Sequence, residues 1–343
     1  MKASLSILGA IAILMQIFPA LAETQVLHVV PAGTSGNTPQ SPYATAETAA
    51  NSISDALNAV SGDQPAVINV APGVYAVDEE IKITKPNVTI QSRDAEGKLA
   101  REKTFIDGGY PEWFPKSVSN RLFKVSANNV TFKGLTLQNS FYRATGNGDG
   151  GAGIYVGNCS GLTVDSCAIT NCCVGNGYGG GILFTTKTVS AMSHLITNTI
   201  VHSCVASGYG GGVSKNQVSS SKDETTDKND WLLIDGCKFI GNNITKEGIF
   251  KPVSSTSNGG AHFGNAPVYV KNSLIEGGWG PQQLNTDAYA VFDNCTFSSF
   301  PDEKWALNTS ATYCTRSFVR CVFKDTYLSF PTSVDAIVVF LAI

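Results

Sequence analysis

The chain has 343 residues, of which 34 are glycine, 3 are methionine and 15% are charged, and its formal net charge at pH 7 is −3. Such a composition is typical of a chain with many tight turns and few helices. The slight negative charge argues against a nucleic acid or an anionic membrane as the binding partner.

The N-terminal residues resemble an export signal. Lys2 precedes an apolar run over residues 5–18, and Ala20-Leu21-Ala22 offers a small-x-small cleavage site. Residues 1–22 are therefore predicted to be a secretory signal peptide, which predicts a secreted protein or one at the cell surface or outer membrane. The alternative, an uncleaved anchor, is disfavoured because the run is short for a bilayer span of roughly 20 residues. No later segment is long enough to cross a membrane.

A capping segment at about 41–60 follows. Within residues 46–60, Ala49, Ile53, Leu57 and Val60 form one apolar stripe at helical spacing. This predicts a short helix that covers the open first turn of the remaining chain. Residues 66–70, 81–83 and 88–90 are predicted to be the first strands.

Seven segments between residues 132 and 323 then fit one short template. Apolar residues stand three before and two after a reference position, and successive reference positions are 22 to 38 residues apart. The residues at the reference position are Leu135, Cys167, Thr199, Cys237, Ser273, Cys295 and Cys321. The segments are short, alternate at period two and end in turn-forming residues, so residues 23–343 are predicted to form one all-β domain, a parallel β-helix. Asparagines at the corners are expected to stack between coils.

Nine cysteines in an exported chain raise the question of disulfides. Cys172 and Cys204 stand at equivalent positions of adjacent coils, as do Cys295 and Cys321. A coil rise of about 4.8 Å falls within the usual Cα separation of a disulfide. Each pair could be bridged, or the cysteines could form a stack of free buried thiols.

Two stretches resemble known families. Val30-Pro31-Ala32-Gly33 and the segments 41–45, 68–75 and 88–90 resemble the start of exported, right-handed parallel β-helix proteins of the pectin-lyase-like superfamily. The middle of the chain resembles the repeats of chlamydial polymorphic outer-membrane proteins. The residues that carry this second resemblance are Gly150-Gly151-Ala152, Gly179-Gly180-Gly181-Ile182, Gly210-Gly211-Gly212-Val213, Gly259-Gly260-Ala261 and Phe239-Ile240-Gly241-Asn242. The resemblance implies a right-handed, single-stranded β-helix whose repeats are structural and carry no chemistry.

The superfamily includes lyases, hydrolases, esterases and adhesins, so catalysis has to be sought residue by residue. Of the hydrolase signatures only Asn285-Thr286-Asp287 is present. A lyase would need a base and often calcium held by clustered acids. The position two before the reference instead alternates in sign, with Lys133 expected beside Asp165 and Lys271 between Asp235 and Asp293. No cofactor or metal is expected, except calcium if the protein is a lyase.

Single candidates for catalysis remain. Lys187 and Lys215 follow glycine-rich strands in successive coils, where a lyase base could lie, although lysines there are usually solvated. His262 stands where the other repeats have small or apolar residues, and a lone histidine of this kind is more often structural than catalytic. His28, His194 and His202 lack metal-ligand spacing.

Long insertions occur at residues 219–230 and 245–258, and such loops on one face of a solenoid often form its binding surface. Nearby aromatic residues that could stack on sugars, or that could be ordinary half-buried residues, are Tyr178, Tyr209, Trp231 and Trp279. The sequence therefore favours an adhesive scaffold that binds an extracellular polysaccharide or a surface protein. The alternative is a polysaccharide lyase acting on an extracellular acidic glycan.

Overall fold

The structure is a computed structural model. It describes residues 23–110, 119–146, 148–185, 194–208, 210–216, 231–244, 258–262, 268–277, 282–285, 290–298, 307–308, 316–324, 328–329 and 338–341.

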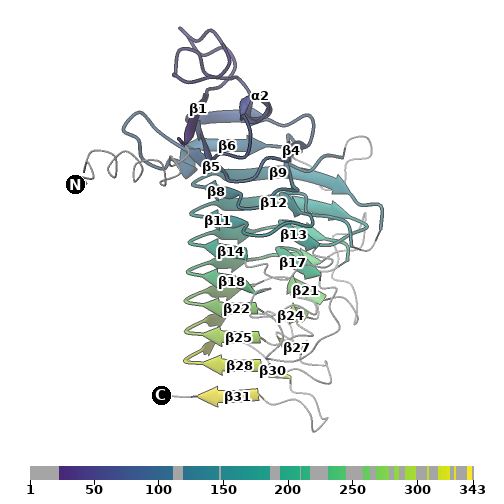
Figure 1. The fold of residues 1–343 in the computed structure, drawn as a ribbon. Coiled ribbons are helices and arrows are strands. Elements are labelled where there is room, and N and C mark those ends of the chain that lie inside the picture. Colours follow the sequence, from purple (N-terminus) through teal and green to yellow (C-terminus); the bar gives the residue numbers. More distant parts are fainter. Residues whose placement is uncertain are drawn as a thin grey trace, which may run out of the picture.

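Three long parallel sheets form the molecule, and from β2 onward the successive coils of the chain add strands to all three (Figure 1). Sheet A consists of β1 (Gln25–Val29), β2 (Ala66–Val70), β5 (Val88–Ser92), β8 (Thr131–Lys133), β11 (Thr163–Asp165), β14 (His194–Thr197), β18 (Leu232–Asp235), β22 (Val268–Lys271), β25 (Ala290–Asp293), β28 (Arg316–Val319) and β31 (Val338–Leu341). Sheet B consists of β3 (Gly73–Ala76), β6 (Thr104–Asp107), β9 (Thr136–Arg143), β12 (Ala168–Gly175), β15 (Ile200–His202), β19 (Lys238–Ile240), β23 (Leu274–Glu276), β26 (Thr296–Ser298) and β29 (Val322–Lys324), with β16 (Val205–Ala206) and β20 (Asn243–Ile244) beside them. Sheet C consists of β4 (Ile81–Ile83), β7 (Phe123–Val125), β10 (Ile154–Val156), β13 (Ile182–Thr185), β17 (Val213–Asn216), β21 (Asn258–His262), β24 (Gln282–Asn285), β27 (Leu307–Asn308) and β30 (Leu328–Ser329). The predicted all-β, right-handed parallel β-helix with a short N-terminal helix is confirmed.

The N-terminal cap differs in detail from the prediction. Helix α2 covers only Ile53–Ala59, and Ser52 caps it by accepting a hydrogen bond from the backbone N–H of Asp55 at 3.1 Å. The preceding residues are not helical, because the N–H of Ala50 donates to His28 and the Ala50 carbonyl accepts from Val30. The segment before the helix therefore follows the edge of β1. A single 3₁₀ turn, η1 (Arg101–Lys103), precedes β6.

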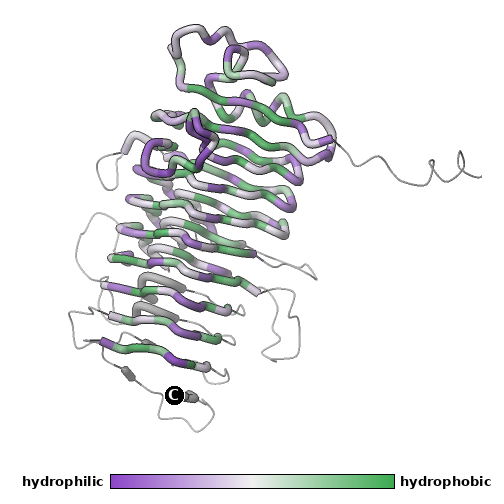
Figure 2. Tube along the Cα trace, turned by 90° about the vertical axis from the view of Figure 1, so that its left-hand side faces the viewer, coloured by the Kyte–Doolittle hydropathy of each residue, from purple (hydrophilic) through white to green (hydrophobic). Residues whose placement is uncertain are grey.

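Inward-facing side chains stack in rows from coil to coil and form one continuous core. Figure 2 shows hydrophobic and hydrophilic residues alternating along the coils. Near the C-terminal end the core is aromatic, with the rings of Phe292 and Phe318 stacked 5.1 Å apart and those of Phe297 and Phe323 stacked 5.0 Å apart. Each buried phenylalanine contributes about 2 to 3 kcal/mol, so stacked rows supply much of the stability.

A tight corner joins sheet A to sheet B in the seven repeats from β8 onward. One residue at the corner has positive φ, at the position just before the predicted reference residue. These corner residues are Gly134, Ser166, Asn198, Gly236, Asn272, Asn294 and Arg320. The predicted asparagine stacking is present, because the Asn294 amide donates to Asn272 Oδ1 at 2.7 Å.

Longer connections enter and leave sheet C, and they contrast with this tight corner. The outer face of sheet C is therefore the face that the longer loops border. Within the described part of the chain, no helix has the length and apolar character needed to span a membrane.

Candidate functional site

Three residues of one outward row on sheet C form the centre of the candidate site. Lys82 of β4 is in register with Lys124 of β7, which is in register with Tyr155 of β10. The flanking residues of each strand point into the core and are buried, so these three side chains point outward. Lys82 is exposed, Lys124 and Tyr155 are half-buried, and Lys124 Nζ lies 5.7 Å from the centre of the Tyr155 ring. Two ammonium groups and an aromatic ring thus line up along the axis of the helix.

Arg121 packs against the aromatic ring at the end of this row. Its side chain is 8% exposed, and its guanidinium carbon lies 3.6 Å from the centre of the Tyr142 ring and 4.5 Å from that of Tyr155. The guanidinium donates to Glu80 Oε2 at 2.9 Å, to the carbonyl of Gly150 at 2.6 Å and to Asp149. Its charge is therefore neutralised by two acids, and Arg121 acts as a support for the two rings.

Asp149 closes the network at the end of a turn. Its carboxylate accepts hydrogen bonds from the Tyr142 hydroxyl at 2.9 Å and from the backbone N–H of Thr145 at 3.0 Å. Burial acts to raise the pKa of Asp149, but the Thr145 N–H, the Arg121 charge and the Tyr142 hydroxyl together hold that pKa below its ordinary value. Burial raises the pKa of Tyr142 to about 12, and the hydrogen bond to Asp149 adds to this effect. Tyr142 therefore stays protonated and keeps donating to Asp149.

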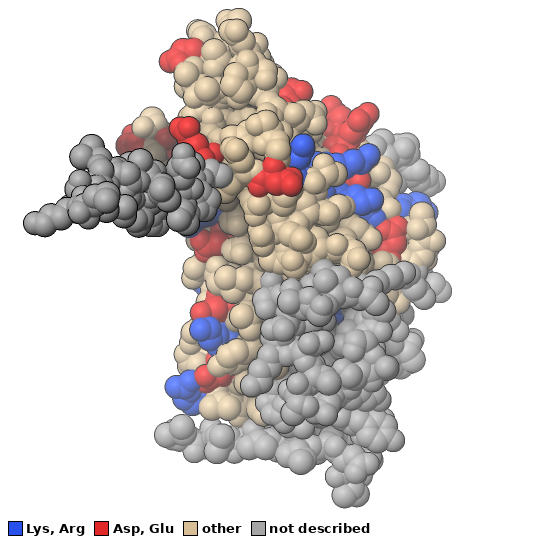
Figure 3. Space-filling view, in the orientation of Figure 1, with Lys and Arg blue, Asp and Glu red and all other residues tan. Residues whose placement is uncertain are grey.

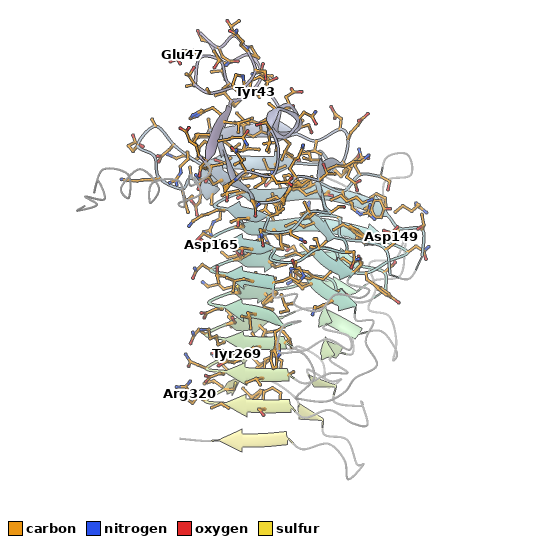
Figure 4. All side chains as sticks on the ribbon, viewed as in Figure 1. Tyr43, Glu47, Asp149, Asp165, Tyr269 and Arg320 are labelled. Atoms are coloured by element: carbon orange, nitrogen blue, oxygen red, sulfur yellow. The ribbon has the colours of Figure 1, made fainter. Side chains whose placement is uncertain are left out.

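Figure 4 places Asp149 on the side of the molecule opposite Asp165, Tyr269 and Arg320. In Figure 3, basic and acidic side chains gather on the same side as Asp149, toward the N-terminal end. A rigid ring with lysines beside it can stack on the apolar face of a sugar and bind a carboxylate.

A second charged row follows the corner between sheets A and B. Lys133 Nζ lies 3.3 Å from Asp165 and Lys271 Nζ lies 3.0 Å from Asp235, as predicted. Asp293, however, is bound by Arg320, whose Nη2 lies 2.6 Å from Asp293 Oδ2. Lys271 lies between Asp235 and Asp293 in the register of sheet A, as predicted. Arg320 was not expected as a partner of Asp293, because it stands at the corner position and not in the alternating row.

These ion pairs bear on the question of calcium. Each acid of this row forms an ion pair with a lysine or an arginine. Within the described ranges, no group of three or more His, Cys, Asp and Glu side chains is placed to hold a metal ion.

Lys215, expected on the surface as a candidate base, points into the helix. It is in register with Phe184, an inward residue of the core, and it is fully buried. A polysaccharide in solution cannot reach its amine, so the expected role as an accessible base is wrong. The alternation Val213-Ser214-Lys215 places it inward, since residues two apart share one face of a strand.

The interior around Lys215 also holds His194. His194 is fully buried, and its Nδ1 accepts the N–H of Leu162 at 3.2 Å while Nε2 has no hydrogen-bond partner. Burial, and then the charge of Lys215, lowers the pKa of His194 to about 3. His194 is therefore neutral at physiological pH and structural in role.

Of the remaining predicted residues, Tyr178, Trp231 and His262 are described, and they lie in different coils. Lys187, Tyr209 and Trp279 lie outside the described residues, and the described backbone of His262 is in register with Ser214. Tyr178 and Trp231 are half-buried and lie at different borders of sheet C. Tyr178 is next to the candidate site, because it forms a bridge with Gly150. The Trp231 carbonyl accepts the His194 N–H on the way into sheet A.

The described cysteines carry free thiols in the structure, and a disulfide in either pair stays a prediction. Cys172 nevertheless lies beside Cys204, and Cys295 beside Cys321, as the equivalent positions predicted. Burial and then the Cys204 thiol raise the pKa of Cys172, and the Cys321 thiol and then burial raise the pKa of Cys295. Cys172 is therefore a buried, protonated and unreactive thiol.

The sequence interpretation missed the site on sheet C. A signal was present, since Ile81-Lys82-Ile83, Phe123-Lys124-Val125 and Ile154-Tyr155-Val156 share one pattern of apolar, outward and apolar residues. The repeat template covered only the strands of sheets A and B, because the corner between them has a constant length. The loops before sheet C vary in length, so the strands of sheet C do not recur at a constant spacing from the template.

The fold places the chain among parallel β-helix proteins. No family model and no curated protein matches it. Similar solved structures include a pectin methylesterase from carrot, with 13% identity, a TM-score of 0.47 and coverage of 94% of this chain and 89% of that one. Pectate lyase Pel9A has 14% identity, a TM-score of 0.47 and coverage of 92% and 79%. An alginate lyase from Paenibacillus has 14% identity, a TM-score of 0.44 and coverage of 79% and 92%. At these values the similarity says nothing about activity.

Proposed function

We propose that this protein is an exported surface scaffold that binds an acidic polysaccharide along the outer face of sheet C. The observation that carries the proposal is the register of Lys82, Lys124 and Tyr155 on three neighbouring coils. Neighbouring strands are about 4.8 Å apart, which is close to the length of one sugar unit in an extended chain. A polyuronate laid along the axis would meet one of these side chains per sugar.

The chemistry of the row fits such a ligand. The Tyr155 ring offers an apolar face, and Lys82 and Lys124 offer ammonium groups for carboxylates. Arg121 holds the ring in one orientation before the ligand arrives, which lowers the entropy that binding costs. Binding through lysines also predicts an affinity that falls as salt rises.

Retention of the mature chain, residues 23–343, on polygalacturonate and on neutral dextran tests the proposal. Lys82→Ala, Lys124→Ala and Tyr155→Ala should each weaken polygalacturonate binding about tenfold, which corresponds to about 1.4 kcal/mol. Lys238→Ala is the matched control, because Lys238 is an exposed, outward lysine on sheet B. Equal binding by all four variants, or equal retention on dextran, would contradict the proposal.

The same incubation distinguishes a binding scaffold from a lyase. A lyase would release an unsaturated sugar that absorbs in the ultraviolet, whereas the scaffold would retain the glycan without new absorbance. If new absorbance appears and Lys124→Ala abolishes it, the protein is a lyase and the scaffold proposal is wrong.

A further inference from the structure

A hollow of about 420 Å³ lies at the N-terminal end, and one of its lining residues, Ile81, directly precedes Lys82 of the row on sheet C. One wall is the start of helix α2 and the segment before it, with Pro31, Asn51 and Ile53. The other wall is strand β3 and the residues that follow it to Ile81. This volume is within the range of ligand-binding pockets, and most of the lining is apolar.

Strand β3 presents a free edge to this hollow. It is the last strand of sheet B and pairs only with β6 among the described strands. Backbone groups of a strand point to both edges, so the edge away from β6 keeps donors and acceptors without a sheet partner. Pro31 closes the edge at Gly73, where an added Cβ would lie 2.3 Å from Pro31 Cγ. Beyond Gly73 the hollow is open, and the Val74 side chain is 61% exposed.

The walls of the hollow are held before any ligand binds. The Asn51 amide donates to Asn37 Oδ1 at 3.0 Å and to the Val30 carbonyl at 3.4 Å. The Tyr75 hydroxyl points inward and donates to the Ala71 carbonyl at 2.7 Å. An extended segment could therefore enter without rearranging the cap.

The charged residues that line the hollow are acidic. Among the described residues that line it, Asp78 and Glu79 are the charged ones, and both are exposed. Neither carboxylate has an ion pair or a side-chain hydrogen bond with another described residue, whereas the next residue, Glu80, is bound by Arg121. A ligand with a positive charge on an apolar stem would complement this lining.

We propose that an extended peptide segment of a partner protein adds as a strand to the free edge of β3 and places a lysine or arginine side chain against Asp78 and Glu79. Main-chain hydrogen bonds to the edge supply affinity, and the acids select the basic residue. The peptide would contact β3 and the two acids, whereas the polysaccharide would contact Lys82, Lys124 and Tyr155.

Fluorescence anisotropy with labelled acetyl-Thr-Val-Lys-Val-Thr-amide tests the proposal on the mature chain. We expect saturable binding, and binding at least about tenfold weaker when norleucine replaces the lysine, because norleucine keeps the stem and lacks the ammonium. Two analogues N-methylated at every second residue, in opposite phases, test strand addition. Only one phase should bind, since a strand added to an edge uses the N–H groups of alternate residues.

Variants of the protein locate the site. Val74→Lys should abolish binding by placing an ammonium in the hollow, and its fold should persist because Val74 is exposed. Asp78→Asn combined with Glu79→Gln should remove the preference for lysine over norleucine. The matched controls are Val26→Lys, on the outer face of β1, and Asp63→Asn combined with Glu276→Gln, which removes the same charge elsewhere.

Four results would overturn the proposal. They are the absence of binding to the lysine peptide, binding that Val74→Lys leaves unchanged, equal binding of lysine and norleucine peptides, and equal binding of both N-methylated analogues. Val74→Lys should still bind polygalacturonate, so failure of the peptide site is distinguishable from failure of the glycan site.

Discussion

Arg121 and Tyr142 meet with the guanidinium carbon 3.6 Å from the centre of the ring, although Arg121 lies just before β7 and Tyr142 lies in β9. The same guanidinium is bound by Glu80 and Asp149. Because the side chain of Arg121 is 8% exposed, its charge depends on these two acids for compensation.

Arg121→Met is predicted to lower the free energy of unfolding by about 3 kcal/mol. The methionine keeps the apolar stem but leaves Glu80 and Asp149 without their cation in a half-buried place. Urea denaturation at pH 7 measures this loss. Arg101→Met is the control, because the Arg101 pair with Glu102 is more exposed and its loss should cost less than about 1 kcal/mol. Similar losses in both variants would show that Arg121 is not a support.

Asn272→Ala is predicted to be less stable than Asn272→Gly by about 1 kcal/mol, the reverse of the usual order of these two residues in regular structure. Asn272 has φ of 50°, which alanine adopts only with strain and glycine adopts freely. Both variants lose the hydrogen bonds to Asp235 and Asn294, so the difference between their free energies of unfolding reports the backbone strain of alanine at positive φ. Thermal and urea unfolding of both variants give the difference. Equal stability would mean that the corner relaxes.

The buried His194 predicts a specific dependence of stability on pH. The unfolded chain binds a proton at His194 near pH 6.5, whereas the folded chain does not bind one until about pH 3. Its contribution is therefore fully present above pH 6.5 and is lost as pH falls toward 3, by about 2 kcal/mol at pH 5.

His194→Leu tests this dependence. Leu232 occupies the same inward row in the next coil, so leucine fits the position. Urea denaturation at pH 7 and pH 5 should show a smaller loss of stability in the variant than in the natural chain. The acids contribute equally to both proteins, because their native partners are unchanged. An identical loss would show that His194 does not stay neutral.

The repeat by itself determined the fold. Apolar residues three before and two after each reference residue can be buried together only if every coil runs in the same direction, and the corner residues then need positive φ. The pairs Lys133 with Asp165 and Lys271 with Asp235 follow from the same register. These features depend on neighbours one coil away, which a constant spacing reveals.

Only the tertiary structure decided which side chains meet on the outer face of sheet C and which polar side chains are buried inside the coil. Glu80, Arg121, Tyr142, Asp149 and Tyr155 come from strands and turns separated by loops of varied length, so no spacing predicts their contact. Lys215 was expected to be exposed because it is charged, but strand alternation places its side chain inside the coil. The hollow beside β3 arises from the packing of the cap, whose helix is shortened by hydrogen bonds between Ala50 and β1. Contacts between distant segments fix these sites, and the local pattern of the sequence does not encode them.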